Sequence, residues 1–256
     1  MFHWNIDPVM LHLGAIQVHW YGLLFAFGLL VGYNLTERMF KAEDKDVKLV
    51  EQLFVYVFIG MIVGSRAFHV IFYDPSFYFS HPLEIVKIWK GGLASHGGFL
   101  GVIIALWLFS KKYNFSLKWL LSRGSIVAMF IAACIRIGNF FNSEIVGDKT
   151  NANWGVIFDR VDSFPRHPVV LYESFSYFII FLILIFLYKK LSKEMFTNIA
   201  FGLTLVLGFG SRMFIEQFKT LQSEFASSMP LTMGQLLSIP FIIVGIILIF
   251  IALKKS

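Results

Sequence analysis

The chain has 256 residues, of which 57% are apolar and 15% charged, whereas soluble domains are typically about 45–50% apolar and about 25% charged. This composition excludes a water-soluble globular enzyme and a disordered tail, and the single cysteine excludes a secreted disulfide scaffold. The net charge of +6 comes without a long basic run or an RNA-binding motif, so no nucleic-acid partner is expected. We expect an all-α integral membrane protein.

Seven segments are mostly apolar over about 20 residues, the length that a helix needs to cross a bilayer. In chain order they are 16–35, 50–73, 93–110, 117–141, 169–188, 196–216 and 233–253. Glycines four residues apart let helices approach closely, and they recur as Gly28/Gly32, Gly60/Gly64 and Gly97/Gly101. We expect a single polytopic membrane domain, 1–256, in which 142–168 form an external loop or a small lid.

The connections between these segments differ in their lysine and arginine content. Assigned alternately to the two sides of the membrane, they carry six basic residues on one side and twelve on the other. Because cytoplasmic loops are enriched in Lys and Arg, the distribution predicts seven transmembrane helices with the N-terminus outside and the C-terminus in the cytoplasm.

Polar side chains within the spans gather at the outer ends, while the inner halves are almost wholly apolar. The group comprises His19, Tyr21, Arg66, His69, His96, Arg136, Asn139, Glu173, Arg212 and Glu216. Charged groups inside a bilayer are costly and mark functional sites, so the pattern favours a closed-ended site in the outer leaflet over an ion path. Each group could instead reach the interface or pair locally, the commoner situation for His19 and His69. Arg123, near a cytoplasmic end, is expected to snorkel.

Sequence spacing joins several of these residues. Arg136 and Asn139 are three apart, and Arg212 and Glu216 are four apart, so each pair shares a helix face. We expect Glu216 to hold Arg212 in position, with Lys219 one turn later. Two arginines against one nearby glutamate leave positive charge for an anion, and the planar guanidinium suits phosphate oxygens.

One histidine, His96, is followed by two glycines that permit close approach of a ligand or a backbone. Histidine titrates near neutrality and can accept a proton from an attacking thiol; alternatively, His96 only begins a helix and binds a carbonyl. The seven histidines contain no HExxH pattern, so no metal site is expected. Neither Ser95 nor Ser211 lies in a GxSxG elbow, which disfavours an intramembrane serine protease.

The twelve residues Arg136–Gly147, RIGNFFNSEIVG, resemble the hallmark motif of the bacterial prolipoprotein diacylglyceryl transferases. Shorter pieces occur in the family's order and extend the resemblance over nearly the whole chain: His19–Gly22, Gly91–Gly101, Arg166–Pro168, Leu171–Glu173 and Arg212–Glu216. The chain departs from the family pattern at Lys219, where arginine is common. It also departs at Val169-Val170, where a more polar pair is common.

The resemblance implies a multi-pass enzyme of the bacterial inner membrane that transfers a diacylglyceryl group from phosphatidylglycerol to the lipobox cysteine of a prolipoprotein signal peptide. The reaction forms a thioether and releases glycerol phosphate, and it implies no cofactor. The implied catalytic residues are His96, Arg136 and Arg212. The implied substrate-binding residues are Arg136, Tyr21, Asn139, Glu144, Gly147 and Glu216, to which we add Arg66 as a charged residue of the second span. An anionic-lipid transporter and a structural membrane scaffold remain open alternatives.

Overall fold

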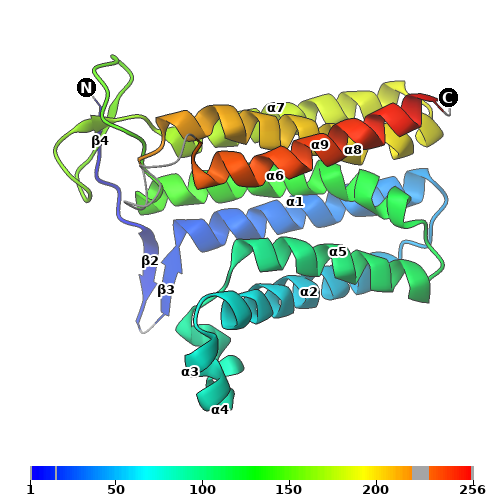
Figure 1. The fold of residues 1–256 in the computed structure, drawn as a ribbon, viewed down its shortest axis with the longest axis horizontal. Helices are drawn as coiled ribbons and strands as arrows, with labels where there is room; N and C mark the ends of the chain where they lie inside the picture. The colour runs from blue at the N-terminus through cyan, green and yellow to red at the C-terminus, as the bar shows by residue number, and fades with distance from the viewer. Residues whose placement is uncertain (1, 15, 221–230, 255–256) are drawn as a thin grey trace. The chain divides into compact units, whose positions relative to one another are not determined.

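Helices and strands are described for residues 2–14, 16–220 and 231–254 of the computed structural model. The long helices within these ranges are α1 (Trp20–Ala42), α2 (Leu49–Phe72), α5 (Ser95–Lys112), α6 (Leu117–Asn142), α7 (Val169–Lys190), α8 (Lys193–Ile215) and α9 (Met233–Lys254). The shorter elements are β1 (Phe2–Trp4), β2 (Val9–Leu13), β3 (Ile16–His19), α3 (Pro75–Ser80), α4 (Pro82–Ile85), η1 (Ile88–Lys90), β4 (Val156–Phe158), β5 (Pro165–Arg166) and η2 (Glu216–Phe218). Figure 1 shows these elements along the chain.

Five of the helical segments among the described residues are long and apolar enough to cross a membrane. They are α2, α6, α7, α8 continued into η2, and most of α9. The helices α1 and α5 also occur where spans were predicted, but polar residues occupy their ends, such as Glu37 and Arg38 in α1 and Lys111 and Lys112 in α5. The protein is therefore mostly helical, with several helices suited to a bilayer.

The helix found at the first predicted span begins and ends later than the predicted segment 16–35. Residues Ile16–His19 form β3, which pairs antiparallel with β2 in the register Val9↔His19. Polar Gln17 and His19 alternate there with apolar residues, the period of a strand. The helix begins at Trp20 and continues to Ala42. It extends past the apolar stretch because charged residues such as Arg38 are also good helix formers.

The chain divides into two compact units, one comprising residues 1–35 and 122–256 and the other residues 36–121. In the first unit, α8 packs against both α7 and α9. A small sheet of order β1-β4-β5 lies within the same unit, with β1 parallel to β4 and β4 antiparallel to β5. Two of its strands lie in the region predicted as an external loop or lid.

A cluster of buried side chains ties this sheet to the ends of α6 and α7. Its members are Trp4, Phe140, Val156, Phe158 and Val170. The indole of Trp4 stacks obliquely on Phe140 with ring centroids 4.3 Å apart, and its Nε1 donates to the Phe140 carbonyl at 3.0 Å. The sheet therefore packs directly on the ends of α6 and α7.

Glycine pairs set the closest helix contacts, as the sequence predicted. In the second unit α2 packs on α5, and a Cβ at Gly60 or Gly64 would collide with the α5 backbone at Gly101 or Gly97. In the first unit, Gly28 and Gly32 of α1 lie against α6 side chains, including those of Val127, Ile131 and Cys134. Backbone approach this close requires a residue without a side chain.

The expectation that Arg123 snorkels to the membrane surface is wrong. Its side chain is only 2% exposed, and the guanidinium donates to the hydroxyls of Ser122 and Thr197. It also lies over the rings of Tyr188 and Phe196, at 5.9 and 5.4 Å from their centroids. Neighbouring hydroxyls and aromatic faces satisfy the cation internally, so it has no need to reach water.

We predict that Gly64→Ala destabilises the fold, while Gly124→Ala does not. The new methyl at position 64 would meet the carbonyl of Gly97 and the Cα of Gly101, whereas a Cβ at Gly124 meets nothing within 4 Å. Overpacking of this kind costs about 1–3 kcal/mol. Unfolding of both variants in detergent micelles measures the difference; equal stability would contradict the packing role of Gly64.

Candidate functional site

A completely buried carboxylate, Glu173 in the first turns of α7, lies at the centre of a charged cluster in the first unit. Its Oε2 lies 2.7 Å from Arg136 Nε, and its Oε1 accepts a hydrogen bond from Lys219 Nζ at 2.8 Å. Oε2 receives no hydrogen bond of normal geometry, so the contact with Arg136 is ionic. A buried carboxylate demands such partners, and it thereby joins α6, α7 and the end of η2.

The predicted pairing of Arg212 with Glu216 is not among the ion pairs of the described residues. Glu216 instead lies 3.0 Å from Lys219 Nζ through its Oε2, and a Cβ at Gly234 of α9 would collide with its carboxylate. The physical reason is local: α8 ends at Ile215, and Glu216–Phe218 form a 3-10 turn, so the four-residue spacing no longer marks a straight α-helical face.

Arg212 consequently differs from Arg136. The described residues, which omit 221–230, hold no ion-pair partner for its half-buried side chain. Both arginines nevertheless interact electrostatically with the buried Tyr177, which also hydrogen-bonds to Arg136. Tyr177 therefore interacts both with an arginine that is paired with a carboxylate and with one that has no ion-pair partner among the described residues.

A branch of hydrogen bonds extends the cluster from α6 into the following loop. Arg136 Nη1 donates to Asn139 Oδ1 at 3.2 Å, and Asn139 Nδ2 donates to Glu144 Oε2 at 2.8 Å. The same carboxylate accepts from Asn142 at 2.7 Å. Tyr21 lies where a Cβ at Gly138 would collide with it, and it interacts electrostatically with Glu144 and Arg136. The predicted binding residues of this stretch are thus brought together.

Gly147 holds the loop against the sheet and against the end of η2. Its backbone N–H donates to the His167 carbonyl at 3.0 Å, and its carbonyl accepts from Arg166 Nη1 at 2.9 Å. It also forms an isolated β-bridge with Lys219. A side chain at this position would strike the His167 and Phe218 carbonyls, so glycine is required by space. Its role is to let three chain segments meet beside the cluster.

The cluster has a more balanced charge than the sequence suggested. Its cations are Arg136, Arg212 and Lys219, and its carboxylates are Glu144, Glu173 and Glu216. Sequence spacing alone missed Glu173 as the centre and Lys219 as its second partner. A carboxylate in an otherwise apolar helix was the available signal, but its partners come from distant segments and no spacing rule finds them.

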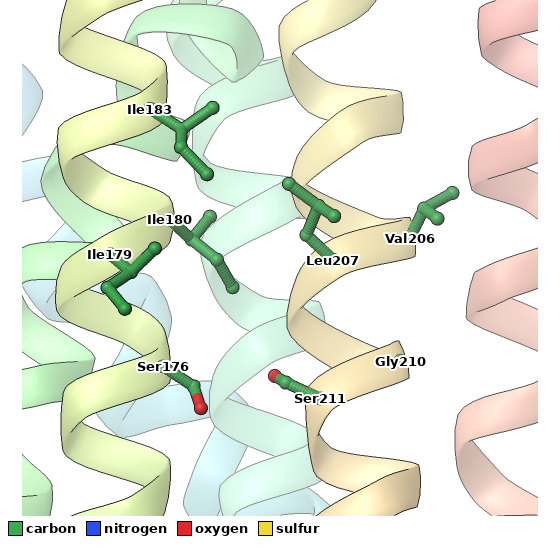
Figure 2. A pocket seen from close by; sticks show the side chains of 8 residues that line it. All are labelled: Ser176, Ile179, Ile180, Ile183, Val206, Leu207, Gly210 and Ser211. Atoms are coloured by element: carbon green, nitrogen blue, oxygen red, sulfur yellow. The ribbon is translucent and has the colours of Figure 1, made fainter.

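Two apolar cavities lie between α7 and α8 and share Ser176. Figure 2 shows the first, of about 350 Å³, with side chains of both helices around it. The hydroxyls of Ser176 and Ser211 each donate to a carbonyl of their own helix, Tyr172 at 2.8 Å and Gly208 at 2.9 Å. The second cavity, of about 540 Å³, is lined largely by aromatic residues that include Trp154 and Phe218. Such linings accommodate hydrocarbon and offer no cation to a phosphate.

The remaining predicted residues lie in the second unit and are described there by themselves. His96 occupies the first turn of α5 with an exposed side chain, its ring 6.4 Å from that of Phe68. Arg66 of α2 is only 6% exposed and donates to four backbone carbonyls of residues 84–92. His69 stacks on Tyr73 with centroids 5.0 Å apart.

Comparison with known proteins gives consistent findings. The sequence profile of the prolipoprotein diacylglyceryl transferase family matches residues 8–251. The phosphatidylglycerol–prolipoprotein diacylglyceryl transferase of Tolumonas auensis is 45% identical and aligns over all of this chain and 99% of its own length. Its counterpart in Chloroherpeton thalassium is 43% identical over 99% of this chain and 95% of its own length. The Bacteroides fragilis protein of the same name is 41% identical, with 99% and 96% covered.

We predict that Glu173→Gln lowers stability much more than Glu51→Gln. The first change leaves Arg136 and Lys219, which are 16% and 10% exposed, without their shared anion. Removing one partner of a buried ion pair costs about 3–5 kcal/mol. Glu51 is an exposed residue of α2 and serves as the matched control. Thermal unfolding in lipid nanodiscs compares them, and equal midpoints would contradict a structural role for the buried carboxylate.

We predict that acid loosens the loop between β4 and β5. Hydrogen bonds from Arg166 lower the pKa of Asp162 below its ordinary value of 3.8, so this pair contributes stability above that pH and loses it as the pH falls through the folded value. The protection of residues 159–166 from hydrogen exchange, taken relative to the intrinsic rate at each pH, should fall on acidification in the native protein. Asp162→Asn should exchange faster already at neutral pH and respond less to acid; an unchanged response would contradict this role.

Proposed function

The chain belongs to the prolipoprotein diacylglyceryl transferase family, and from that premise we propose that it transfers a diacylglyceryl group from phosphatidylglycerol to the lipobox cysteine of a prolipoprotein. The observation that carries this proposal is the charged cluster around Glu173. There, one arginine is fixed by a buried carboxylate, and a second has no ion-pair partner among the described residues. Both lie in helices that are apolar enough to cross a membrane.

In this proposal the phosphodiester of the lipid binds to Arg212 and Arg136. Arg136 is already oriented by Glu173 and Asn139, so it stabilises the developing charge without reorganising during the reaction. Arg212 supplies the guanidinium that is available to the ligand. The acyl chains remain in the hydrocarbon surroundings of the helices.

The chemical step is a displacement at carbon. The cysteine sulfur forms a bond to the glyceryl carbon that bears the phosphate ester, and the bond between that carbon and the ester oxygen breaks. The products are a thioether and glycerol phosphate, whose charge the arginines neutralise. We assign removal of the thiol proton to His96, although a thiol with a pKa near 8.5 is partly ionised without help.

The other expected positions act on the substrates through the same cluster. Tyr21, Asn139, Glu144 and Gly147 shape the loop beside Arg136, and Glu216 restrains Lys219. We propose that they bind the head group and the signal peptide near its cysteine. No metal or other cofactor takes part in this scheme.

We further propose the membrane arrangement that the sequence predicts. Seven helices cross the bacterial inner membrane as one domain, with the N-terminus outside and the C-terminus in the cytoplasm. Support comes from the long helix that overlaps each of the seven predicted segments in the described ranges, and from the distribution of basic residues between the connections. The reaction then takes place at the outer leaflet.

The decisive experiment incubates the purified protein with phosphatidylglycerol liposomes and a synthetic lipobox peptide. We expect the mass of the peptide to increase by one diacylglyceryl group, and glycerol phosphate to appear in equal amount. Folded protein that moves lipid between leaflets without forming the adduct would support the transporter instead and overturn the proposal.

In the same assay we predict unequal effects of arginine substitutions. Arg212→Ala should lower kcat/KM by about 10²–10³-fold, and Arg212→Lys should recover only part of it because a point charge replaces the bidentate fork. Arg38→Ala, at an exposed residue of α1, is the control for the loss of one positive charge. Equal rates for Arg212→Ala and the control would exclude Arg212 from the reaction.

A further inference from the structure

Arg66 lies within the apolar helix α2, and its guanidinium donates hydrogen bonds to backbone carbonyls of a segment in the same unit. Nε donates to the Ile85 carbonyl at 2.8 Å, and Nη2 donates to the Glu84 carbonyl at 2.6 Å. Nη1 donates to the carbonyls of Gly91 and Gly92 at 2.7 and 3.0 Å. Four of the five donors that a guanidinium carries are thereby used. A residue so engaged has little left with which to bind a phosphate.

Tyr78 and Gly92 also contact the guanidinium of Arg66 and restrict its position. The ring of Tyr78 lies 4.8 Å beneath the guanidinium, a cation–π contact that offsets the loss of water. A Cβ at Gly92 would collide with Arg66 Nη1 and with the His69 ring, and the backbone there has φ +73°. Glycine at 92 is therefore required both by conformation and by the approach of the arginine.

The segment that Arg66 holds is also restrained from its outer side. The carboxylate of Glu84 binds Lys87 at 2.5 Å and Lys90 at 2.9 Å. These hydrogen bonds lower the pKa of Glu84 to about 2, so the carboxylate stays ionised at neutral pH. Both ends of the Glu84–Gly92 segment are thus hydrogen-bonded to Arg66 of α2, and the Glu84 side chain is also paired with Lys87 and Lys90.

This segment ends three residues before Ser95, the first residue of α5, and His96 lies in the first turn of that helix. The Ala94 N–H donates to the Ser65 carbonyl at 3.0 Å, and a Cβ at Gly97 would meet the Gly64 carbonyl. Contacts from three consecutive α2 residues, Gly64, Ser65 and Arg66, therefore bracket His96 on both sides along the chain. The His96 side chain is exposed, and no hydrogen bond joins it to the part of the chain that the structure describes.

We propose that Arg66 is a positioning residue, which fixes the Glu84–Gly92 segment on α2 and so sets the placement of His96, and that it does not bind the phospholipid. The proposal rests on the proposed function for its catalytic consequence, whereas the anchoring can be tested without activity. It replaces the expectation, based on charge alone, that Arg66 contacts substrate. Lysine cannot substitute, because a single ammonium cannot reach carbonyls that the planar fork addresses from three nitrogens.

The test uses Arg66→Lys in full-length protein in phosphatidylglycerol nanodiscs, with Arg38→Lys as the matched control. We expect kcat for adduct formation to fall about 10²-fold, as for a misplacement of about 1 Å, while KM for phosphatidylglycerol stays unchanged. Hydrogen exchange of residues 84–94 should accelerate in the variant and remain native in the control. Gly92→Ala places a methyl group against Arg66 Nη1. It should therefore also lower kcat and accelerate the hydrogen exchange of residues 84–94.

Each result distinguishes the possibilities. A raised KM with native kcat would mean that Arg66 contacts the lipid and would overturn the proposal, as would native hydrogen exchange in residues 84–94. Equal loss of folded protein in Arg66→Lys and Gly92→Ala without a change in kcat per folded molecule would also overturn it. If the wild-type protein forms no adduct, the proposed function fails, and the exchange measurement still decides whether Arg66 anchors the segment.

Discussion

The ionic contact of a fully buried carboxylate with two cations is the constraint on which the first unit depends. Glu173 is 0% exposed, and an isolated carboxylate in such surroundings would be prohibitively costly. It therefore fixes Arg136 of α6 and Lys219 beyond η2 at ion-pair distances. The position of Lys219 then sets the bridge to Gly147, so one buried charge organises a helix, a loop and a helix end.

In the second unit a buried arginine is held by backbone carbonyls in place of a carboxylate. The helices of this unit approach through glycines until backbone meets backbone, as at Gly60 and Gly101. In the same unit Arg66 donates to four carbonyls of the Glu84–Gly92 segment. In both units an arginine is immobilised before any ligand arrives, once by a carboxylate and once by carbonyls. Arginine thus serves as a structural element as well as a binding group.

Sequence reasoning found what depends on local pattern. The glycine pairs, the Arg136–Asn139 contact and the positions of the long helices follow from spacing and apolarity within one segment. It failed at Glu216, which pairs with Lys219 and not with Arg212 because the α-helix ends at Ile215 and the four-residue spacing no longer holds. It also failed where the partners come from other segments, since Arg123 is enclosed by residues of α7 and α8. The strand Ile16–His19 was not predicted for a different reason. Its alternating pattern is only four residues long and directly precedes a long apolar segment, so the helix was predicted to include it.

The balanced charge of the cluster bears on how the proposed reaction could turn over. A site with a large excess of positive charge would attract phosphatidylglycerol and would hold the departing glycerol phosphate equally well, which gives no gain in rate. Here three carboxylates oppose three cations, so in the proposed reaction the anion is stabilised by the local placement of Arg212 and Arg136 and not by net charge. Glu173 keeps Arg136 aimed while cancelling part of its long-range field. A fixed arginine favours the transition state, whereas a strong positive charge slows the release of the anionic product. In this proposal the buried carboxylate of Glu173 both fixes Arg136 and reduces its net charge.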